Sequence, residues 1–270
     1  MIRILISGEH GYIANCFAQS LTDQACYETK TISLRGDGWR TVDFSGYDVV
    51  VHTAALVHQR ETEGNAPLYN KINRDLTIEL AEKARVEGVR QFVFLSTSSV
   101  YGKVEGVITK DTKPQPVTNY GKSKLEAEKG LSSMSSKDFS VAIVRPLMVY
   151  GKDCKGNYQT LVKIAKIAPV LPDYENCRSL VSVETLCAEM KKLIDQQAEG
   201  IFFPQEETPI CTCRLIQQVA ESYGRHPRRT KLLNPVIQLL RMTTSQGKKA
   251  FGDLVYQDLE MLPLDSLKKC

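Results

Sequence analysis

Tyr120 and Lys124 are the pair of side chains whose spacing is most suggestive of chemistry. They are four residues apart, so a helix places both on one face. A free tyrosine loses its proton near pH ~10, and a neighbouring ammonium stabilises the tyrosinate, so the pair is typical of general acid–base catalysis at neutral pH. Gly121 costs a helix roughly 1 kcal/mol relative to alanine, and such a local weakness is typical of a functional position.

A cluster of hydroxyls, Ser96-Thr97-Ser98-Ser99, accompanies this pair. It follows the apolar segment 91–95, and ligands of open parallel sheets bind at the carboxyl ends of strands. A hydroxyl there can hydrogen-bond a substrate carbonyl oxygen and share the proton that Tyr120 delivers. A Ser/Thr-rich turn explains any single one of these residues equally well, and Tyr-x-x-x-Lys alone also fits an exposed helix face.

A glycine loop lies near the N-terminus, with the spacing Gly8-x-x-Gly11-x-x-Ala14. It follows the apolar run 2–7 and precedes an amphipathic segment. Glycines permit a tight turn and a close approach of the backbone to a pyrophosphate, whose charge meets the N–H groups at the helix N-terminus. The loop, Tyr12 and Ile13 included, is therefore a predicted dinucleotide site, although glycines also commonly end strands.

The end of the second predicted strand bears on the choice of nicotinamide cofactor. An acidic residue there would bind the ribose hydroxyls of NAD. The sequence instead has Ser33 followed by Arg35, whose guanidinium suits a 2′-phosphate. This favours NADP(H), while Asp37 leaves NAD(H) as the alternative if the strand runs longer, and Arg35 also fits a solvated loop charge.

Short apolar runs alternate with longer helical patterns over the first two thirds of the chain, which predicts an α/β fold with a parallel sheet. One helix is expected over 67–87 and another from about Thr118. The predicted strands are Ile2–Ser7, Glu28–Leu34, Asp48–His52, Gln91–Ser96 and Ser140–Arg145.

After Arg145-Pro146, glycines and prolines break the pattern into shorter pieces, so a second, smaller lobe is expected from 151 to 270. A strand over 179–183 and a helix over 184–196 still resemble sheet material. We therefore expect the segment 179–203 to return to the first lobe, 1–150.

The composition is that of an ordinary globular protein, with 270 residues, 42% hydrophobic and 24% charged, which excludes disorder and collagen. The net charge is +4, and no basic run with interleaved aromatics predicts a nucleic-acid partner. The apolar runs match neither a signal peptide nor the ~18 residues of a membrane span. We expect a cytoplasmic protein with no membrane partner.

The eight cysteines form no CxxC units and only four histidines accompany them, so no metal site is expected. All eight are interpreted as reduced thiols. Cys211-Thr212-Cys213, the one close pair, is typical of small residues where a strand meets a helix.

Taken together, the motifs resemble the extended short-chain dehydrogenases/reductases that act on nucleotide sugars. That family implies a Rossmann-type doubly wound parallel sheet holding NAD(P), with a smaller C-terminal lobe that binds a nucleotide diphosphate sugar. The resemblance rests on Gly8-x-x-Gly11-x-x-Ala14, His52-Thr53-Ala54-Ala55, Asn73, Ser96-Thr97-Ser98-Ser99-Val100-Tyr101-Gly102, Tyr120-x-x-x-Lys124, Arg145-Pro146-x-x-Val149-Tyr150-Gly151 and Arg178-Ser179-Leu180-Val181-Ser182-Val183.

The resemblance also implies roles for individual residues. Tyr120 would be the acid/base, Lys124 would lower its pKa and hold the nicotinamide ribose, and Thr97 would polarise the sugar oxygen. Arg178 would clamp the substrate pyrophosphate, with Asn157 as a weaker candidate for the same phosphates. The remaining implied contacts are Asp43 and Phe44 with the adenine, Thr53, Ala54, Ala55 and Pro146 with the cofactor, and Ser98 and Ser99 with the substrate.

One departure from the family pattern reduces the number of reactions that we expect of this chain. Sugar 4,6-dehydratases that resemble this chain carry Asp-Glu after the catalytic Thr, where Ser98-Ser99 stand here. We therefore expect a reductase of a UDP-linked, N-acetylated 6-deoxy-4-keto-hexosamine that serves surface polysaccharide synthesis. A 4-epimerase with tightly bound NAD is the alternative, and a non-catalytic NADP(H) sensor is a more remote one because such proteins lose Tyr or Lys. The resemblance also suggests a homodimer that would include the Tyr120 helix.

Overall fold

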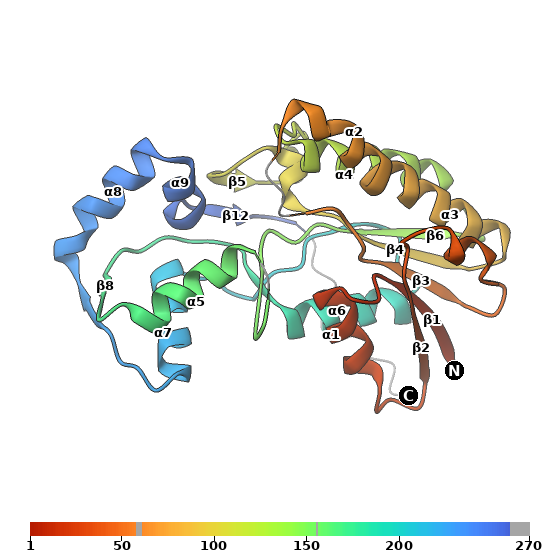
Figure 1. Cartoon of the computed structure of the whole chain (residues 1–270), viewed down its shortest axis with the longest axis horizontal. Helices are drawn as coiled ribbons and strands as arrows, with labels where there is room; N and C mark the ends of the chain where they lie inside the picture. Colours follow the sequence, from red (N-terminus) through yellow and green to blue (C-terminus); the bar gives the residue numbers. More distant parts are fainter. Residues whose placement is uncertain (58–60, 155, 260–270) are drawn as a thin grey trace.

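The computed structural model describes residues 1–57, 61–154 and 156–259. Its centre is a parallel sheet of six strands in the order β10-β6-β4-β3-β1-β2 (Figure 1). The order reverses between β1 and β3, so the predicted doubly wound, Rossmann-type α/β fold is confirmed. The strands are β1 (Ile2–Ser7), β2 (Tyr27–Ile32), β3 (Val49–His52), β4 (Gln91–Leu95), β6 (Ser140–Val144) and β10 (Gly200–Phe202).

The strand register aligns the carboxyl ends of the central strands. Ser7 of β1 lies opposite His52 of β3, and His52 in turn lies opposite Phe94 of β4. Leu95 of β4 lies opposite Val144 of β6. The loops that follow these strands, which carry the glycine loop and the hydroxyl cluster, therefore meet at one edge of the sheet.

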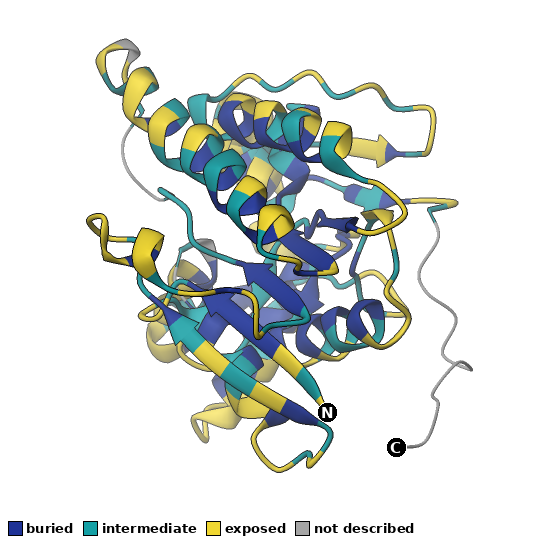
Figure 2. Ribbon diagram, turned by 90° about the vertical axis from the view of Figure 1, so that its right-hand side faces the viewer, coloured by how far each residue is buried: buried dark blue, intermediate teal, exposed yellow. Residues whose placement is uncertain are grey.

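Successive strand residues face two different cores, because both faces of the sheet are covered by helices (Figures 1 and 2). Ile4 and Ile6 pack toward α1 (Tyr12–Leu21) and α6 (Val183–Asp195). Leu5 and Val50 pack toward η1 (Gly38–Thr41), α3 (Leu76–Val86) and α4 (Asn119–Met134). The strands were recognisable in the sequence because burial on both faces requires continuous apolar runs.

The single helix expected over 67–87 is in fact interrupted. It consists of α2 (Ala66–Tyr69), a π-helical turn η3 (Asn70–Asp75) and α3, preceded by the 3₁₀ turn η2 (Glu63–Asn65). The wider turn carries Asn73, which is fully buried and bonds both backbone groups of Leu56, N–H at 2.7 Å and C=O at 3.1 Å. Such turns are frequent at functional sites.

A second lobe with its own core contains mainly elements from beyond residue 156. Tyr158 and Leu161 of its first helix pack against Leu215 and Ile216. Its two short strands, β8 and β11, pair in parallel. The elements are α5 (Asn157–Ile167), β8 (Val170–Pro172), α7 (Thr212–Ser222), β11 (Arg228–Thr230), η5 (Lys231–Leu233), α8 (Asn234–Thr243) and α9 (Ser245–Phe251).

The chain crosses between the two parts of the molecule several times. The strand predicted over 179–183 is β9 (Val181–Ser182), and it pairs with β7 (Val149–Tyr150) instead of joining the main sheet. The sixth strand of that sheet is β10, which pairs with β6. Further on, β12 (Leu254–Tyr256) pairs with β5 (Gly106–Ile108), beside the 3₁₀ turn η4 (Ser98–Tyr101).

The seven cysteines in the described part of the chain are free thiols, and Cys270 lies outside it. Cys211 is the N-cap of α7, and Cys213 lies in the first turn of that helix. In those same ranges, no helix is long and apolar enough to cross a membrane, and no cluster of His, Cys, Asp and Glu side chains is suited to a metal ion.

A buried ion pair joins α4 to the end of β6. Arg145 and Glu128 are 5% and 3% exposed, and Arg145 donates to both Glu128 oxygens, with Nε–Oε1 at 3.0 Å and Nη2–Oε2 at 2.5 Å. Ser96 donates to the same carboxylate, and Nη1 of Arg145 donates to the Tyr101 hydroxyl at 2.7 Å. Burial of two charges is tolerated only with such complete hydrogen bonding.

We predict that Glu128→Ala lowers the free energy of unfolding by about 3–5 kcal/mol, because it leaves the guanidinium buried without a carboxylate. Glu126 on the same helix offers the control, since its ion pair with Lys129 is exposed, and Glu126→Ala should cost less than about 1 kcal/mol. Urea denaturation measures both. Equal losses would show that the buried pair contributes no more to the free energy of unfolding than the exposed pair does.

Candidate active site

The glycine loop has the geometry of a pyrophosphate cradle. Gly8 has φ +105°, and a Cβ there would lie 3.0 Å from Thr53 Oγ1. A Cβ on Gly11 would lie 2.9 Å from the Gly8 oxygen. Helix α1 begins at Tyr12 with Gly11 as its N-cap and no capping side chain. Its first N–H groups are therefore available to an anion, so these residues fit a dinucleotide.

The segment Thr53-Ala54-Ala55 borders the cradle, as expected from its place after β3. Thr53 Oγ1 donates to the Ser7 oxygen at 2.8 Å. The backbone of Ala54 lies 3.4 Å from the position of a Cβ on Gly8. These residues therefore lie at the reversal point of the sheet, where doubly wound folds bind their ligands.

Four other residues predicted to contact the cofactor are placed by the structure. Tyr12 is half-buried and donates to the Lys152 oxygen at 2.7 Å, which ties the glycine loop to the start of the second lobe. Ile13 and Ala14 pack into the α1 core. Pro146 is buried, and its oxygen accepts the Ser98 N–H at 2.9 Å.

Arg35 and Asp37, which follow β2, have different surroundings. The strand ends at Ile32, so it is shorter than predicted and does not reach Asp37. Arg35 is exposed, and its N–H donates to Ser33 Oγ at 3.3 Å. Asp37 is instead bound by Arg40. The acid that would favour NAD is therefore engaged elsewhere.

Of the two residues predicted near adenine, only Asp43 is accessible. Its carboxylate accepts the Ser45 N–H at 2.9 Å, and this bond lowers the pKa of Asp43. Phe44 has no exposed surface and packs in the core, while its N–H donates to Glu87 at 2.6 Å. A side chain with no accessible surface cannot contact a ligand, so of the two only the Asp43 side chain is open to the predicted adenine contact.

Helix α4 is brought unusually close to η4. A Cβ on Gly121 would lie 2.6 Å from the Ser99 oxygen, so only glycine permits this approach. The helix start is capped by Thr118, which accepts the Gly121 N–H at 3.0 Å. Glu61 accepts the N–H groups of Asn119 and Tyr120 at 2.7 and 3.2 Å. The glycine that weakens the helix therefore brings the tyrosine to the hydroxyl cluster.

Thr97 is the centre of that cluster. Its Oγ1 accepts the Ser99 N–H and lies 3.1 Å from Ser99 Oγ. A hydrogen bond with Thr97 also lowers the pKa of Tyr120, although burial of the phenol is the larger effect and raises it. The tyrosine and threonine hydroxyls therefore lie near each other, as an acid and a polarising group for the same oxygen require.

Lys124 is buried, with 1% exposure. Its ammonium donates to the Leu95 oxygen at 2.8 Å and lies 4.1 Å from the centre of the Phe94 ring. Burial lowers the pKa of Lys124 to about 7, and Glu128 opposes that shift. The ammonium is thus bonded to the backbone of β4, and the lowering of the Tyr120 pKa by Lys124 stays a prediction.

Several supporting residues were given no role from the sequence. Asn73, one of the residues that carry the resemblance, donates to Ser123 Oγ at 3.1 Å, and Ser123 donates to the backbone oxygen of Tyr120 at 2.9 Å, so both brace α4. Glu128 and Glu61 were missed altogether. Glu128 had a signal, since it follows Lys124 by one helical turn and the arginine that ends a buried strand needs a carboxylate.

The predicted substrate residues are less closely grouped. Ser99 touches Thr97, while Ser98 is 7% exposed and donates to the Leu147 oxygen at 3.4 Å. Arg178 is 6% exposed and donates to the Gly252 oxygen at 2.7 Å. Burial lowers its pKa, and no carboxylate in the described part of the chain forms an ion pair with its guanidinium. The Asn157 side chain lies outside the described part of the structure.

Comparison with known proteins identifies the family. Residues 4–171 match the NAD dependent epimerase/dehydratase family. A UDP-glucose 4-epimerase of Vibrio cholerae is 31% identical over 248 residues, which are 80% of this chain and 74% of that protein. The chain belongs to the NAD-dependent epimerase/dehydratase family. This confirms the resemblance that the motifs predicted.

Solved structures share the fold of this epimerase/dehydratase chain. The UDP-glucuronic acid 4-epimerase of Bacillus cereus, in complex with NAD, has a TM-score of 0.71 at 17% identity and covers 96% of this chain and 90% of its own. The dTDP-4-dehydrorhamnose reductase of Bacillus anthracis, in complex with NADP, has a TM-score of 0.66 at 18% identity and covers 85% and 83%. Both cofactor types thus occur on this fold.

We predict a pH dependence of stability from Lys124. The unfolded chain binds one more proton than the folded chain between pH ~7 and ~10, so stability rises with pH by up to ~1.4 kcal/mol per unit. The unfolding free energy of the wild type should therefore gain about 2 kcal/mol relative to Lys124→Met between pH ~7.5 and ~9. Urea melts at several pH values measure this, with exposed Lys122→Met as control. A constant difference would contradict the burial of a titrating ammonium.

Proposed function

We propose that the chain is an NAD(P)-dependent oxidoreductase acting at C4 of a nucleotide diphosphate sugar. The observation that carries the proposal is the convergence of the Tyr120 and Thr97 hydroxyls at the edge of the sheet that also holds the glycine cradle. Proteins that sense NADP(H) without catalysis lose the tyrosine or the lysine, whereas this chain has both Tyr120 and Lys124.

The side chains divide the chemistry between them. When bound, the nicotinamide supplies or accepts hydride at the sugar carbon. Tyr120 donates a proton to the oxygen on that carbon in the reductive direction and removes it in the oxidative one. Thr97 holds the same oxygen in line. The buried Lys124 orients the cofactor ribose and offers positive charge to the tyrosinate.

Net reduction of a UDP-4-keto-6-deoxy-hexosamine with NADPH is the reaction we favour. Arg35 stands exposed just past the short β2, where it suits a 2′-phosphate, while Arg40 engages Asp37. Ser98 and Ser99 follow Thr97, so the carboxylates that would eliminate water are missing. Such a product serves surface polysaccharide synthesis.

A 4-epimerase is the second candidate, supported by the similarity to the Vibrio cholerae enzyme. It would use the same residues. Tyr120 would first remove and later return the proton, while hydride leaves one face of the sugar and returns to the other. Tightly held NAD would be the mark of this alternative.

We propose that the lobes divide the ligands between them. Residues 1–150, with 179–203, would hold the cofactor, and most of 151–270 would hold the sugar nucleotide. Arg178 supports this division, because a buried guanidinium without a carboxylate partner in the described ranges is suited to a pyrophosphate. Asn157 is proposed to assist it. A homodimer involving α4 is part of the same proposal.

The test is an assay of the purified protein with NADPH, or with NADH, and UDP-4-keto-6-deoxy-N-acetylglucosamine. Loss of nicotinamide absorbance is expected, faster with NADPH. Tyr120→Phe should lower kcat by about 10²–10⁴, whereas Tyr223→Phe, at an exposed position of the second lobe, should not change it. Copurified NAD with interconversion of UDP-hexoses and no net oxidation would replace the reductase by the epimerase.

A further inference from the structure

Helix α8 of the second lobe has an apolar side that faces solvent. The side chains concerned are aliphatic and are between 41% and 87% exposed. They recur at the spacing of one helix face, continuous with the turn that precedes the helix. We call this set the α8 face; it consists of Leu232, Val236, Leu239, Leu240 and Met242.

The orientation of α8 is fixed by its opposite side. Ile237 is buried, and Arg241 pairs with Glu105 at 2.7 Å and donates to the Tyr174 hydroxyl at 2.9 Å. The following helix α9 crosses so closely that a Cβ on Gly247 would lie 2.8 Å from the Arg241 nitrogen. The α8 face is therefore presented outward by a rigid pair of helices at the outer end of the lobe (Figure 1).

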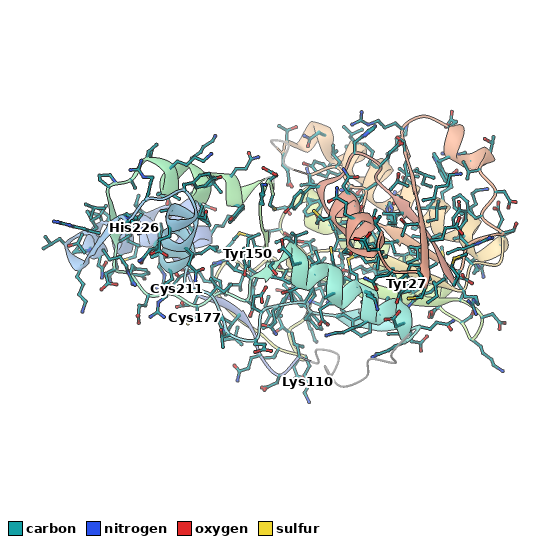
Figure 3. The ribbon with its side chains drawn as sticks, turned by 90° about the horizontal axis from the view of Figure 1, so that it is seen from below. Tyr27, Lys110, Tyr150, Cys177, Cys211 and His226 are labelled. Carbon is teal, nitrogen blue, oxygen red and sulfur yellow. The ribbon has the colours of Figure 1, made fainter. Side chains whose placement is uncertain are left out.

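The chain around the α8 face is strongly basic. Between residues 222 and 252 there are seven Lys and Arg residues and no Asp or Glu. Arg229 pairs with Asp173, and Arg241 with Glu105. No carboxylate in the described ranges pairs with the other five, which are Arg225, Arg228, Lys231, Lys248 and Lys249. His226 marks this end of the molecule in Figure 3.

We propose that the α8 face docks on an anionic lipid surface. An exposed apolar face in a segment that carries five cations without a carboxylate partner has the composition of a helix that lies in a membrane interface. The ten residues of α8 are about 15 Å long, half the ~30 Å of a hydrocarbon core, so the helix lies on the bilayer and does not span it. The inference does not depend on the proposed activity.

The charges disfavour other occupants of the same face. Two copies of this chain would bring five unpaired cations from each into one interface, where like charges repel. A nucleic acid would match the charge, but the aliphatic side chains offer no aromatic surface for stacking bases. An anionic bilayer meets both properties, because the aliphatic chains enter the acyl boundary while the cations contact headgroups.

The test is flotation of the full chain with vesicles of phosphatidylcholine alone and vesicles that also contain phosphatidylglycerol. We expect binding to the anionic vesicles that weakens with salt, and much weaker binding to the neutral ones. Leu239→Asp should weaken binding by at least about tenfold. Neutralising Arg228 and Lys231 with Gln should weaken it roughly fivefold for each residue.

The control is Val86→Asp, which introduces the same charge at an 80% exposed position of α3 and should leave binding unchanged. Equal binding by Leu239→Asp would overturn the proposal, as would absence of binding to anionic vesicles. A dimer in sedimentation equilibrium that Leu239→Asp dissociates, with no vesicle binding, would make the α8 face a contact between copies. Circular dichroism and thermal melting show whether each variant is folded.

Discussion

The arrangement of the candidate active site depends on the buried ion pair between Glu128 and Arg145. Arg145 directly follows β6, a strand that is buried on both faces, so its charge is stabilised only by a carboxylate and hydroxyls placed around it. Glu128 lies one helical turn beyond Lys124, so the pair fixes α4 against the ends of β4 and β6. The close contact at Gly121 then determines where Tyr120 meets Thr97.

Much of this arrangement could be predicted from the sequence. The five predicted strands are present because parallel strands between two helical layers require unbroken apolar runs. Three of them end one or two residues earlier than predicted, where the chain turns into the site. The glycine loop and Thr97 lie at one edge because strand ends of a parallel sheet share it, a constraint that holds whatever the lengths of the connections; Tyr120 reaches Thr97 from α4, through the close contact at Gly121.

The remaining features depend on contacts that a linear pattern does not contain. The strand over 179–183 has the right composition, but composition does not specify a partner, and β9 pairs with β7. The π-helical turn forms because Asn73 must reach Leu56 and Ser123. A search for long apolar runs cannot detect a helix that lies on a bilayer, so the proposed docking of α8 departs from the expectation of no membrane partner for a reason that hydropathy alone does not show. Only the anchoring of Arg241 and Ile237 shows which side of α8 faces outward.

In the proposed reaction, Tyr120 protonates the oxygen of the carbon that receives hydride. The sharpest test uses NADPH that carries deuterium at the transferred position of nicotinamide C4. This NADPH is incubated with the keto sugar, and the product is measured by mass spectrometry and NMR. We expect one deuterium on C4 of the sugar with the wild type, and far slower incorporation with Tyr120→Phe. A product without deuterium at C4, or equal incorporation by Tyr120→Phe, would contradict it.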